Sequence, residues 1–198
     1  MARQEKTDKK FNGRELQKNR TRKALVASAS ELLRNGKQPT VTDAAEAAGI
    51  SRATAYRYFP SQEMLWAEVA LFAADGPIVN RGTESAPAPE AIADLVRGVG
   101  TWSYENERPL RALLRLSLDP DTGIRRPGHR VEWIANTLAP VRGSMDTKTY
   151  NRLSRVLTLM LGIDPVVVMT DIAGVNREQA LDALEWSART LVEAALRR

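Results

Sequence analysis

Hydrophobic residues recur at helical spacing along most of the chain. Residues 20–35 place four apolar side chains on one helical face, at positions Leu25, Ala29, Leu32 and Leu33. Gly36 follows at the position where a helix commonly ends with a left-handed residue. The pattern predicts a helix over residues 20–35 and, because it repeats along the chain, an all-α fold.

Two short helices are predicted over residues 40–59. Thr40 is placed to cap the first, and Asp43 three residues later completes a capping box. Ser51 is placed to cap the second, which must end before Pro60 because proline cannot donate a backbone hydrogen bond. By spacing, two short helices around a tight turn indicate a helix-turn-helix.

The rest of the chain is expected to be helical, with one linker. Ser61 caps a fourth helix, and the composition of residues 76–90 predicts the linker. Further helices are expected over residues 91–106, 108–118, 129–139 and 147–173, with a last helix that begins after Asn176. We therefore expect a small domain over residues 1–66 and a larger helical domain over residues 67–198.

Composition excludes several kinds of site. The 198 residues include no cysteine and one histidine, His129, so disulfides, thiolate metal sites and histidine-based triads are excluded. The carboxylate pairs Glu105/Glu107 and Asp119/Asp121 are two residues apart, a spacing at which helical side chains do not face each other. The chain also lacks a Gly-rich phosphate loop and metal-ligand spacing. We expect no enzyme activity, no metal and no cofactor.

Charge is concentrated at the N-terminal end. Residues 1–23 carry nine Lys and Arg and three Asp and Glu, whereas the whole chain has a formal net charge of +5, so the remainder is close to neutral. A basic segment on a neutral body suits a phosphate partner, although a solvated tail is the alternative. An anionic membrane is disfavoured because residues 1–18 lack an apolar face, and they also lack the apolar core of a signal peptide. A cytoplasmic protein with no membrane partner is expected.

The second helix of the pair mixes aromatic, basic and hydroxyl side chains. Ala55 and Phe59 are expected to be buried, which leaves the first turn facing outward. Arg52 can bridge guanine O6 and N7, and the methyl group of Thr54 can contact a thymine methyl group. Tyrosine hydroxyls suit phosphates, as does the helix N-terminus at Ser51. This chemistry favours major-groove DNA recognition; a helical hairpin inside an ordinary bundle is the alternative.

The stretch TVTDAAEAAGISRATAYRYFPSQEML, residues 40–65, resembles the DNA-binding signature of the TetR (tetracycline-repressor) family of bacterial transcriptional regulators. The resemblance covers roughly residues 20–66. Three residues depart from the family pattern: Gln62 stands where a phosphate-binding Lys is frequent, and Ala44 and Ala55 where a larger aliphatic residue is usual. The DNA-binding residues we expect are Thr40, Ser51, Arg52, Ala53, Thr54, Tyr56, Arg57, Tyr58 and Gln62.

The resemblance implies an all-helical homodimer that represses transcription from a palindromic operator. Its N-terminal helix-turn-helix domain would bind double-stranded DNA, and its C-terminal domain would bind a small effector and release the DNA. The alternative is a helix-turn-helix protein that has no small-molecule ligand and binds DNA constitutively or under control of a protein partner.

The C-terminal domain contains a strongly apolar run, residues 156–172. A membrane span is disfavoured because the run is short and contains Asp164, Pro165 and Asp171. A helix that is apolar on every side is expected to be buried on every side, in part against a second subunit. The last helix has a matching narrow seam, although packing within one chain is the alternative. The expected dimer interface consists of Leu157, Leu161, Leu181, Leu184, Ala188, Leu191 and Ala195.

The sequence gives little information about the effector pocket. Six side chains lie on helices that could enclose a cavity: Trp102, Tyr104, Leu113, Leu116, Trp133 and Met160. Because few charges interrupt these faces, an apolar or aromatic ligand is expected. His129 could bond such a ligand or lie at an exposed loop end.

Overall fold

The computed structural model describes the backbone of residues 2–74 and 86–197, and the side chains of residues 16–73 and 86–197. All regular elements in these ranges are helices, so the expected all-α fold is confirmed. The α-helices are α1 (Ala2–Arg34), α2 (Val41–Ala47), α3 (Arg52–Tyr58), α4 (Gln62–Ala74), α5 (Ala88–Glu105), α6 (Glu107–Leu118), α7 (His129–Leu138), α8 (Thr147–Thr158), α9 (Ile163–Val167) and α10 (Arg177–Leu196). Short 3-10 turns lie at η1 (Pro120–Thr122) and η2 (Ala139–Ser144), and a π-helical turn lies at η3 (Val168–Ile172).

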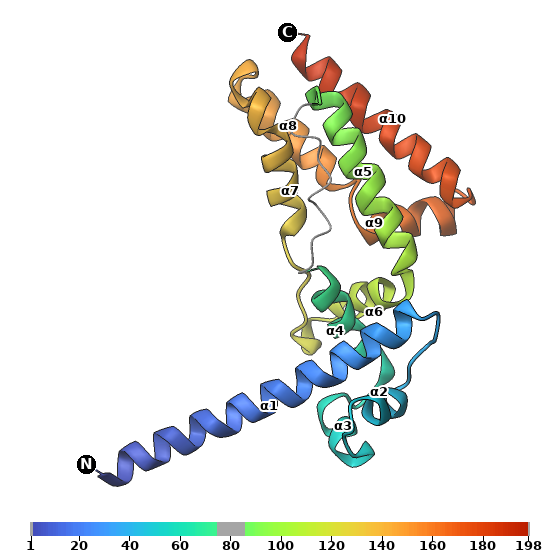
Figure 1. The fold of residues 1–198 in the computed structure, drawn as a ribbon. Helices are drawn as coiled ribbons and strands as arrows, with labels where there is room; N and C mark the ends of the chain where they lie inside the picture. The colour runs from blue at the N-terminus through green and yellow to red at the C-terminus, as the bar shows by residue number, and fades with distance from the viewer. Residues whose placement is uncertain (1, 75–85, 198) are drawn as a thin grey trace.

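Helices α1–α4 enclose a small core. Figure 1 shows α2 and α3 on one side of α1, whose N-terminal end projects beyond the other helices. The buried side chains of this core include Leu25, Val41, Ala44, Ala55 and Phe59. Ala44 and Ala55, which stand where a larger aliphatic residue is usual in the TetR pattern, are both fully buried in it.

A second core fills the upper body in Figure 1. There α5, α7, α8 and α10 pack around buried aliphatic side chains such as Ile92, Ile134 and Leu157. Helices α5 and α10 approach each other closely at Gly100, where an added Cβ would lie 2.5 Å from Leu181 Cδ2. Arg97 of α5 forms an ion pair with Glu185 of α10 beside this contact.

A third core joins the two parts of the molecule. Ala67 and Ala70 of α4 pack with Leu110 and Leu113 of α6 and with α9. Helix α4 also contributes to the small core, so the domain boundary expected at residue 66 falls inside one continuous helix. The α1–α4 part is therefore attached to the body through α4.

Several element boundaries differ from the sequence predictions. Helix α1 begins at Ala2 rather than at residue 20, so the basic segment continues the helix; side chains up to residue 15 lie outside the described residues. Helix α5 begins at Ala88, inside the expected linker, most of which (residues 76–85) lies outside the described residues.

The expected single helix over residues 147–173 is wrong. The chain turns after Thr158, and Gly162 adopts a left-handed φ of 84° before α9 starts. The two arms, Thr147–Thr158 and Ile163–Ile172, meet at a bend of 55°. Glycine allows this break because it has no Cβ to clash at positive φ.

No single helix among the described residues has the length and apolar composition needed to cross a membrane, although these two arms together do.

Candidate functional site

Helices α2 and α3 are each fixed at their ends by local hydrogen bonds. The Thr40 side chain accepts from the Asp43 N–H at 3.1 Å, and the Asp43 carboxylate accepts from the Thr40 N–H at 2.8 Å. The Asp43 carboxylate also accepts from the Thr40 hydroxyl at 2.8 Å, and the bonds it accepts from the Thr40 N–H and hydroxyl hold the pKa of Asp43 below its ordinary value, because both favour the ionised form. The predicted capping box is confirmed.

A tight turn then sets the angle between α2 and α3. Gly49 has a φ of 64°, and the Ile50 N–H donates to the Ala45 carbonyl at 2.9 Å. Ser51 caps α3: its Oγ accepts from the Thr54 N–H at 3.3 Å and donates to Thr54 Oγ1 at 2.9 Å. The predicted cap is therefore present, and a hydrogen bond joins the two hydroxyls.

Helix α3 divides cleanly into an anchored face and an open face. Ala55 and the following Phe59 are buried in the small core, as the sequence predicted. Four of the expected DNA-binding side chains are exposed on the opposite side: Arg52, Ala53, Tyr56 and Arg57. Tyr58 is half-buried, and the Arg57 guanidinium lies 5.9 Å from the centre of its ring.

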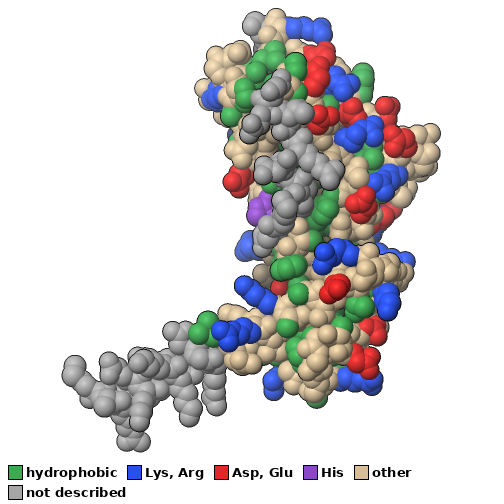
Figure 2. Space-filling model, in the orientation of Figure 1, with side chains coloured by type: hydrophobic (Ala, Val, Ile, Leu, Met, Phe, Trp, Pro, Cys, Tyr) green, Lys and Arg blue, Asp and Glu red, His purple; other side chains and the backbone are tan. Residues whose placement is uncertain are grey.

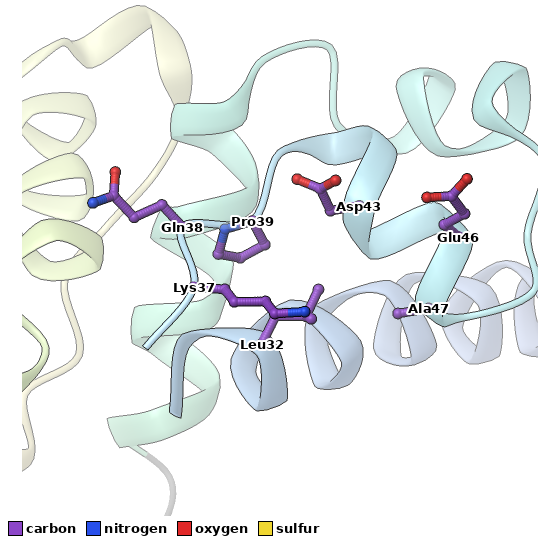
Figure 3. Close-up of a pocket in the computed structure, with 7 residues that line it drawn as sticks. All are labelled: Leu32, Lys37, Gln38, Pro39, Asp43, Glu46 and Ala47. Atoms are coloured by element: carbon purple, nitrogen blue, oxygen red, sulfur yellow. The ribbon is translucent and has the colours of Figure 1, made fainter. Parts of the chain in front are cut away.

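Helix α2 places acidic groups next to this open face. Glu46 lies 3.9 Å from the Arg52 guanidinium across the turn. Figure 3 shows Asp43 and Glu46 along α2, opposite the loop that carries Lys37 and Pro39. Together with Leu32 of α1, Gln38 and Ala47, they line a hollow of about 230 Å³. Sequence spacing gave no sign of the Glu46–Arg52 pair, because the turn between the two helices determines whether they meet.

Two residues of the expected DNA-binding surface have structural partners instead. The Gln62 amide donates to the Pro39 carbonyl at 3.3 Å, beside a 3.0 Å bond from the Trp66 indole to the same oxygen, so Gln62 holds the loop before α2. Arg22, within the basic segment, bonds both oxygens of Glu68 on α4 and lies 5.6 Å from the centre of the Phe59 ring. Arg22 therefore fastens α1 to α4.

Figure 2 shows Lys and Arg side chains around the lower part of the molecule, with Asp and Glu side chains among them. Over residues 16–66, whose side chains are described, the sequence carries eight Lys and Arg and four Asp and Glu. Beyond the basic segment, residues 24–66 carry four Lys and Arg and four Asp and Glu, so the excess of positive charge on this part of the molecule comes from the basic segment itself.

The six expected pocket residues lie in two different cores. Trp102, Tyr104, Leu113 and Leu116 belong to the joining core, whereas Trp133 and Met160 pack against the core of the upper body. Of the six, Trp102 lines a groove of about 750 Å³ where α1 and α4 meet the turn between α5 and α6. His129 is the first residue of α7, and its ring stacks on Trp133 with 5.9 Å between ring centres.

The seven residues of the expected dimer seam differ in how far their own chain buries them. Leu157, Leu161, Leu181 and Ala188 are buried within their own chain, so they have no surface left for a partner. Leu184, Leu191 and Ala195 are partly buried against the same core. The apolar run is also less buried than expected, because Leu159, Val168 and Ile172 are exposed.

The outward faces of α8 and α10 form a different surface. A groove of about 180 Å³ between them is lined by Thr149, Arg152, Leu153, Val156, Leu191, Ala194 and Ala195. Trp186, further along α10, is exposed. Leu191 and Ala195 are therefore the two seam residues that border a surface a partner could reach.

No group of three or more His, Asp or Glu side chains among the described residues could hold a metal ion. Neither a scan against protein-family models nor a search of curated proteins finds a match to this chain.

Proposed function

We propose that the chain is a DNA-binding transcriptional regulator of the TetR type, in which α3 enters the major groove. The supporting observation is the division of α3: Ala55 and Phe59 anchor it, while Arg52, Ala53 and Tyr56 are exposed. Arg52 reads guanine, and Ala53 keeps the helix close to the base edges. A helix inside an ordinary bundle would have no need of an exposed Arg and Tyr opposite its buried face.

In this proposal Arg52 leaves Glu46 and pairs with a guanine base when the protein binds DNA. The side chain of Arg52 is 70% exposed, so its 3.9 Å pairing with Glu46 is weak and easily replaced. A guanine edge offers two acceptors in the plane of the guanidinium, which is the stronger arrangement. Phosphate contacts come from the N-terminal basic segment, except for Arg22, which is committed to Glu68.

We further propose a homodimer that uses the outward faces of α8 and α10. Ala194 and Ala195 on the rim of the groove between them allow close helix approach, and a two-fold axis there would pair the same faces of both subunits. Two copies of α3 would then read two half-sites of a palindromic operator.

A conformational change that releases DNA would be transmitted through α4. This helix contributes to the small core and to the joining core, and Arg115 of α6 pairs with its Glu63 at 2.8 Å. A ligand that shifts α6 or α9 would move α4 and with it α3, which lowers DNA affinity if the two arrangements differ in their contacts with DNA. The alternative, regulation without a small molecule, is favoured by the dispersal of the six pocket residues over two cores.

The test begins by selecting bound genomic fragments to obtain an operator. We expect Arg52→Ala to weaken binding to that operator by about 1–3 kcal/mol and to leave binding to random DNA almost unchanged, because base contacts carry discrimination. Arg34→Ala, which changes an exposed Arg of α1 away from α3, is the matched control.

A single half-site should bind the wild-type protein much more weakly than the full operator, which tests the dimer in the same titration. Equal loss on operator and random DNA for Arg52→Ala would remove its assignment as a base-reading residue. Failure to select any preferred fragment would overturn the proposed function.

A further inference from the structure

The upper body carries a hollow of about 420 Å³ at the start of α7. Its walls come from the start of α7 and the residues before it, from the end of α8 and from α9: Arg126, Pro127, Gly128, Arg130, Val131, Thr158, Leu159 and Asp164. The hollow therefore lies at the 55° bend that interrupts the apolar run. None of the six residues expected to form an effector pocket lines it.

Two arginines share one carboxylate in this hollow. Arg126 Nη1 donates to both oxygens of Asp164, at 2.8 and 2.9 Å, and Arg130 Nη1 lies 2.7 Å from the same carboxylate. Partial burial of Asp164 opposes its ionisation, but the bonds and charges of both arginines outweigh this and hold its pKa below the ordinary value. The cluster is thus two cations and one anion, with a net charge of +1.

Both arginines also have N–H groups that take no part in these hydrogen bonds. Arg130 Nη1 also donates to the Leu161 carbonyl at 2.9 Å, and its guanidinium lies over Gly162. All of these bonds use Nη1, so Nε and Nη2 of both arginines have no hydrogen-bond partner among the described residues. A guanidinium has five N–H donors in a planar fork that matches a carboxylate.

Apolar surface borders the charged cluster. Val131 is 62% exposed and Leu159 is 71% exposed, and both line the hollow. A single exposed aliphatic side chain is ordinary. Two of them in the same hollow as a pair of incompletely bonded arginines fit a ligand with an apolar chain and one negative charge.

We propose that this hollow binds the carboxylate of an aliphatic monocarboxylic acid, with Arg126 and Arg130 holding the head group and Val131 and Leu159 covering the chain. The single negative charge matches the net charge of the cluster. The ligand carboxylate competes with Asp164 for the same guanidinium groups, so Asp164 acts as an internal substitute for the ligand when the hollow is empty.

The position of Asp164 connects this site to the rest of the molecule. Its neighbours Ile163 and Val166 are buried in the joining core, against α6 and α4. When the ligand displaces Asp164, α9 loses its tether to Arg126, and the packing against α4 can change. This link names the effector class of the proposed regulator and rests on that function; ligand binding itself does not.

Calorimetric titration of the full chain with decanoate, below its micelle concentration, tests the site. We expect saturable binding of decanoate, with decanol and decyltrimethylammonium binding at least about tenfold more weakly, because hydrogen bonds to a charged group are the strong ones. Inorganic phosphate tests the head group alone and should also bind more weakly. Decanol or phosphate binding as tightly as decanoate would overturn the proposal.

Three variants locate the binding. Arg126→Gln should weaken decanoate binding about tenfold or more, whereas Arg125→Gln, the exposed neighbouring arginine, should leave it unchanged. Asp164→Asn should strengthen binding several-fold, because it weakens the internal competitor. Circular dichroism checks that each variant is folded. Equal affinities for the Arg126 and Arg125 variants, or weaker binding by a folded Asp164→Asn variant, would refute the site.

Operator binding measured with and without decanoate separates this proposal from the proposed function. A decrease in operator affinity with decanoate supports the regulatory link. Decanoate binding without any change in operator affinity overturns the link and leaves the site. If the chain selects no operator at all, the proposed function fails, while the calorimetric result still decides the site.

Discussion

The α2–α3 pair and the segment from α8 to η3 differ in how far the local sequence determines their structure. Each short helix of the pair begins at a capping residue, Thr40 or Ser51, and the turn between them passes through Gly49. Each of these features acts through hydrogen bonds that span five residues or fewer along the chain. The local sequence is therefore sufficient to place the pair and to say which face of α3 is anchored.

The segment from α8 to η3 has strong apolar character but few local signals of that kind. Leu157 and Leu161 are fully buried, whereas Leu159 between them is exposed. The bend at Gly162 and the contacts of α7 and α9 decide which of these leucines faces inward. The contrast teaches that helix ends can be predicted from neighbouring residues, but that the partner of an apolar face depends on the whole fold.

The largest expected change in stability tests which leucines belong to the core of the upper body. Leu157→Ala should lower the free energy of unfolding by about 2–5 kcal/mol, because a fully buried side chain leaves a cavity. Leu159→Ala, on the exposed position, should change it by less than about 0.5 kcal/mol. Chemical denaturation followed by circular dichroism measures both.

Protein concentration gives the control for the Leu157 prediction. If Leu157 were a subunit contact, the denaturation midpoint of Leu157→Ala would instead depend less on protein concentration than that of the dimeric wild type, and the dissociated chain would remain stable. That outcome would restore the seam expected from the sequence and remove the contrast between the two regions.

The middle-sized effect concerns the close approach of α5 and α10. A Cβ on Gly100 would lie 2.5 Å from Leu181 Cδ2, whereas a Cβ on Gly98 meets nothing within 4 Å. Both glycines lie in α5, so the gain in helix propensity from alanine is shared. We expect Gly100→Ala to be less stable than Gly98→Ala by about 1–3 kcal/mol, the cost of overpacking. Equal thermal stability of the two variants would show that α5 and α10 are packed loosely.

Much of the fold and part of the candidate site could be predicted from sequence. Caps at Thr40, Ser51 and Asn176 were correct because an N-cap bonds a backbone N–H three residues later. The exposure of Arg52 followed from the same helix register.

Contacts between residues that are distant along the chain could not be predicted from the sequence. Arg22 reaches Glu68 over 46 residues, and Arg126 reaches Asp164 over 38. Nothing in the local pattern separates Arg22 from the other basic residues of its segment. Likewise, Trp102 and Trp133 looked alike in the sequence but lie in different cores, because helix packing decides which apolar faces meet.

The smallest expected effect tests a local feature of the α2–α3 pair. Asp43 accepts hydrogen bonds from the backbone N–H and the hydroxyl of Thr40, which lowers its pKa in the folded chain. A carboxylate with a lowered folded-state pKa contributes stability above its unfolded pKa, near 3.9, and loses that contribution as the pH falls through the lower folded value. Because Asp43 is exposed, solvent screening limits the contribution to about 1 kcal/mol or less. Asp43→Asn should therefore be slightly less stable than the wild type at pH 7.

The pH dependence of that difference separates the capping box from a general loss of charge. Urea denaturation from pH 7 to pH 2.5 should show the wild type and Asp43→Asn converging below about pH 4, where the wild-type carboxylate becomes protonated. Other carboxylates, such as Asp164 and Glu185, also have lowered pKa values, but they are present in both proteins and cancel in the difference. Asp182→Asn, which removes an exposed carboxylate of α10 that has no hydrogen bond or ion pair among the described residues, should match the wild type throughout. A stability difference for Asp43→Asn that stays constant from pH 7 to pH 2.5 would mean that the ionised carboxylate does not stabilise the start of α2. Local capping would then contribute less to the stability of the α2–α3 pair than we infer from its comparison with the segment from α8 to η3.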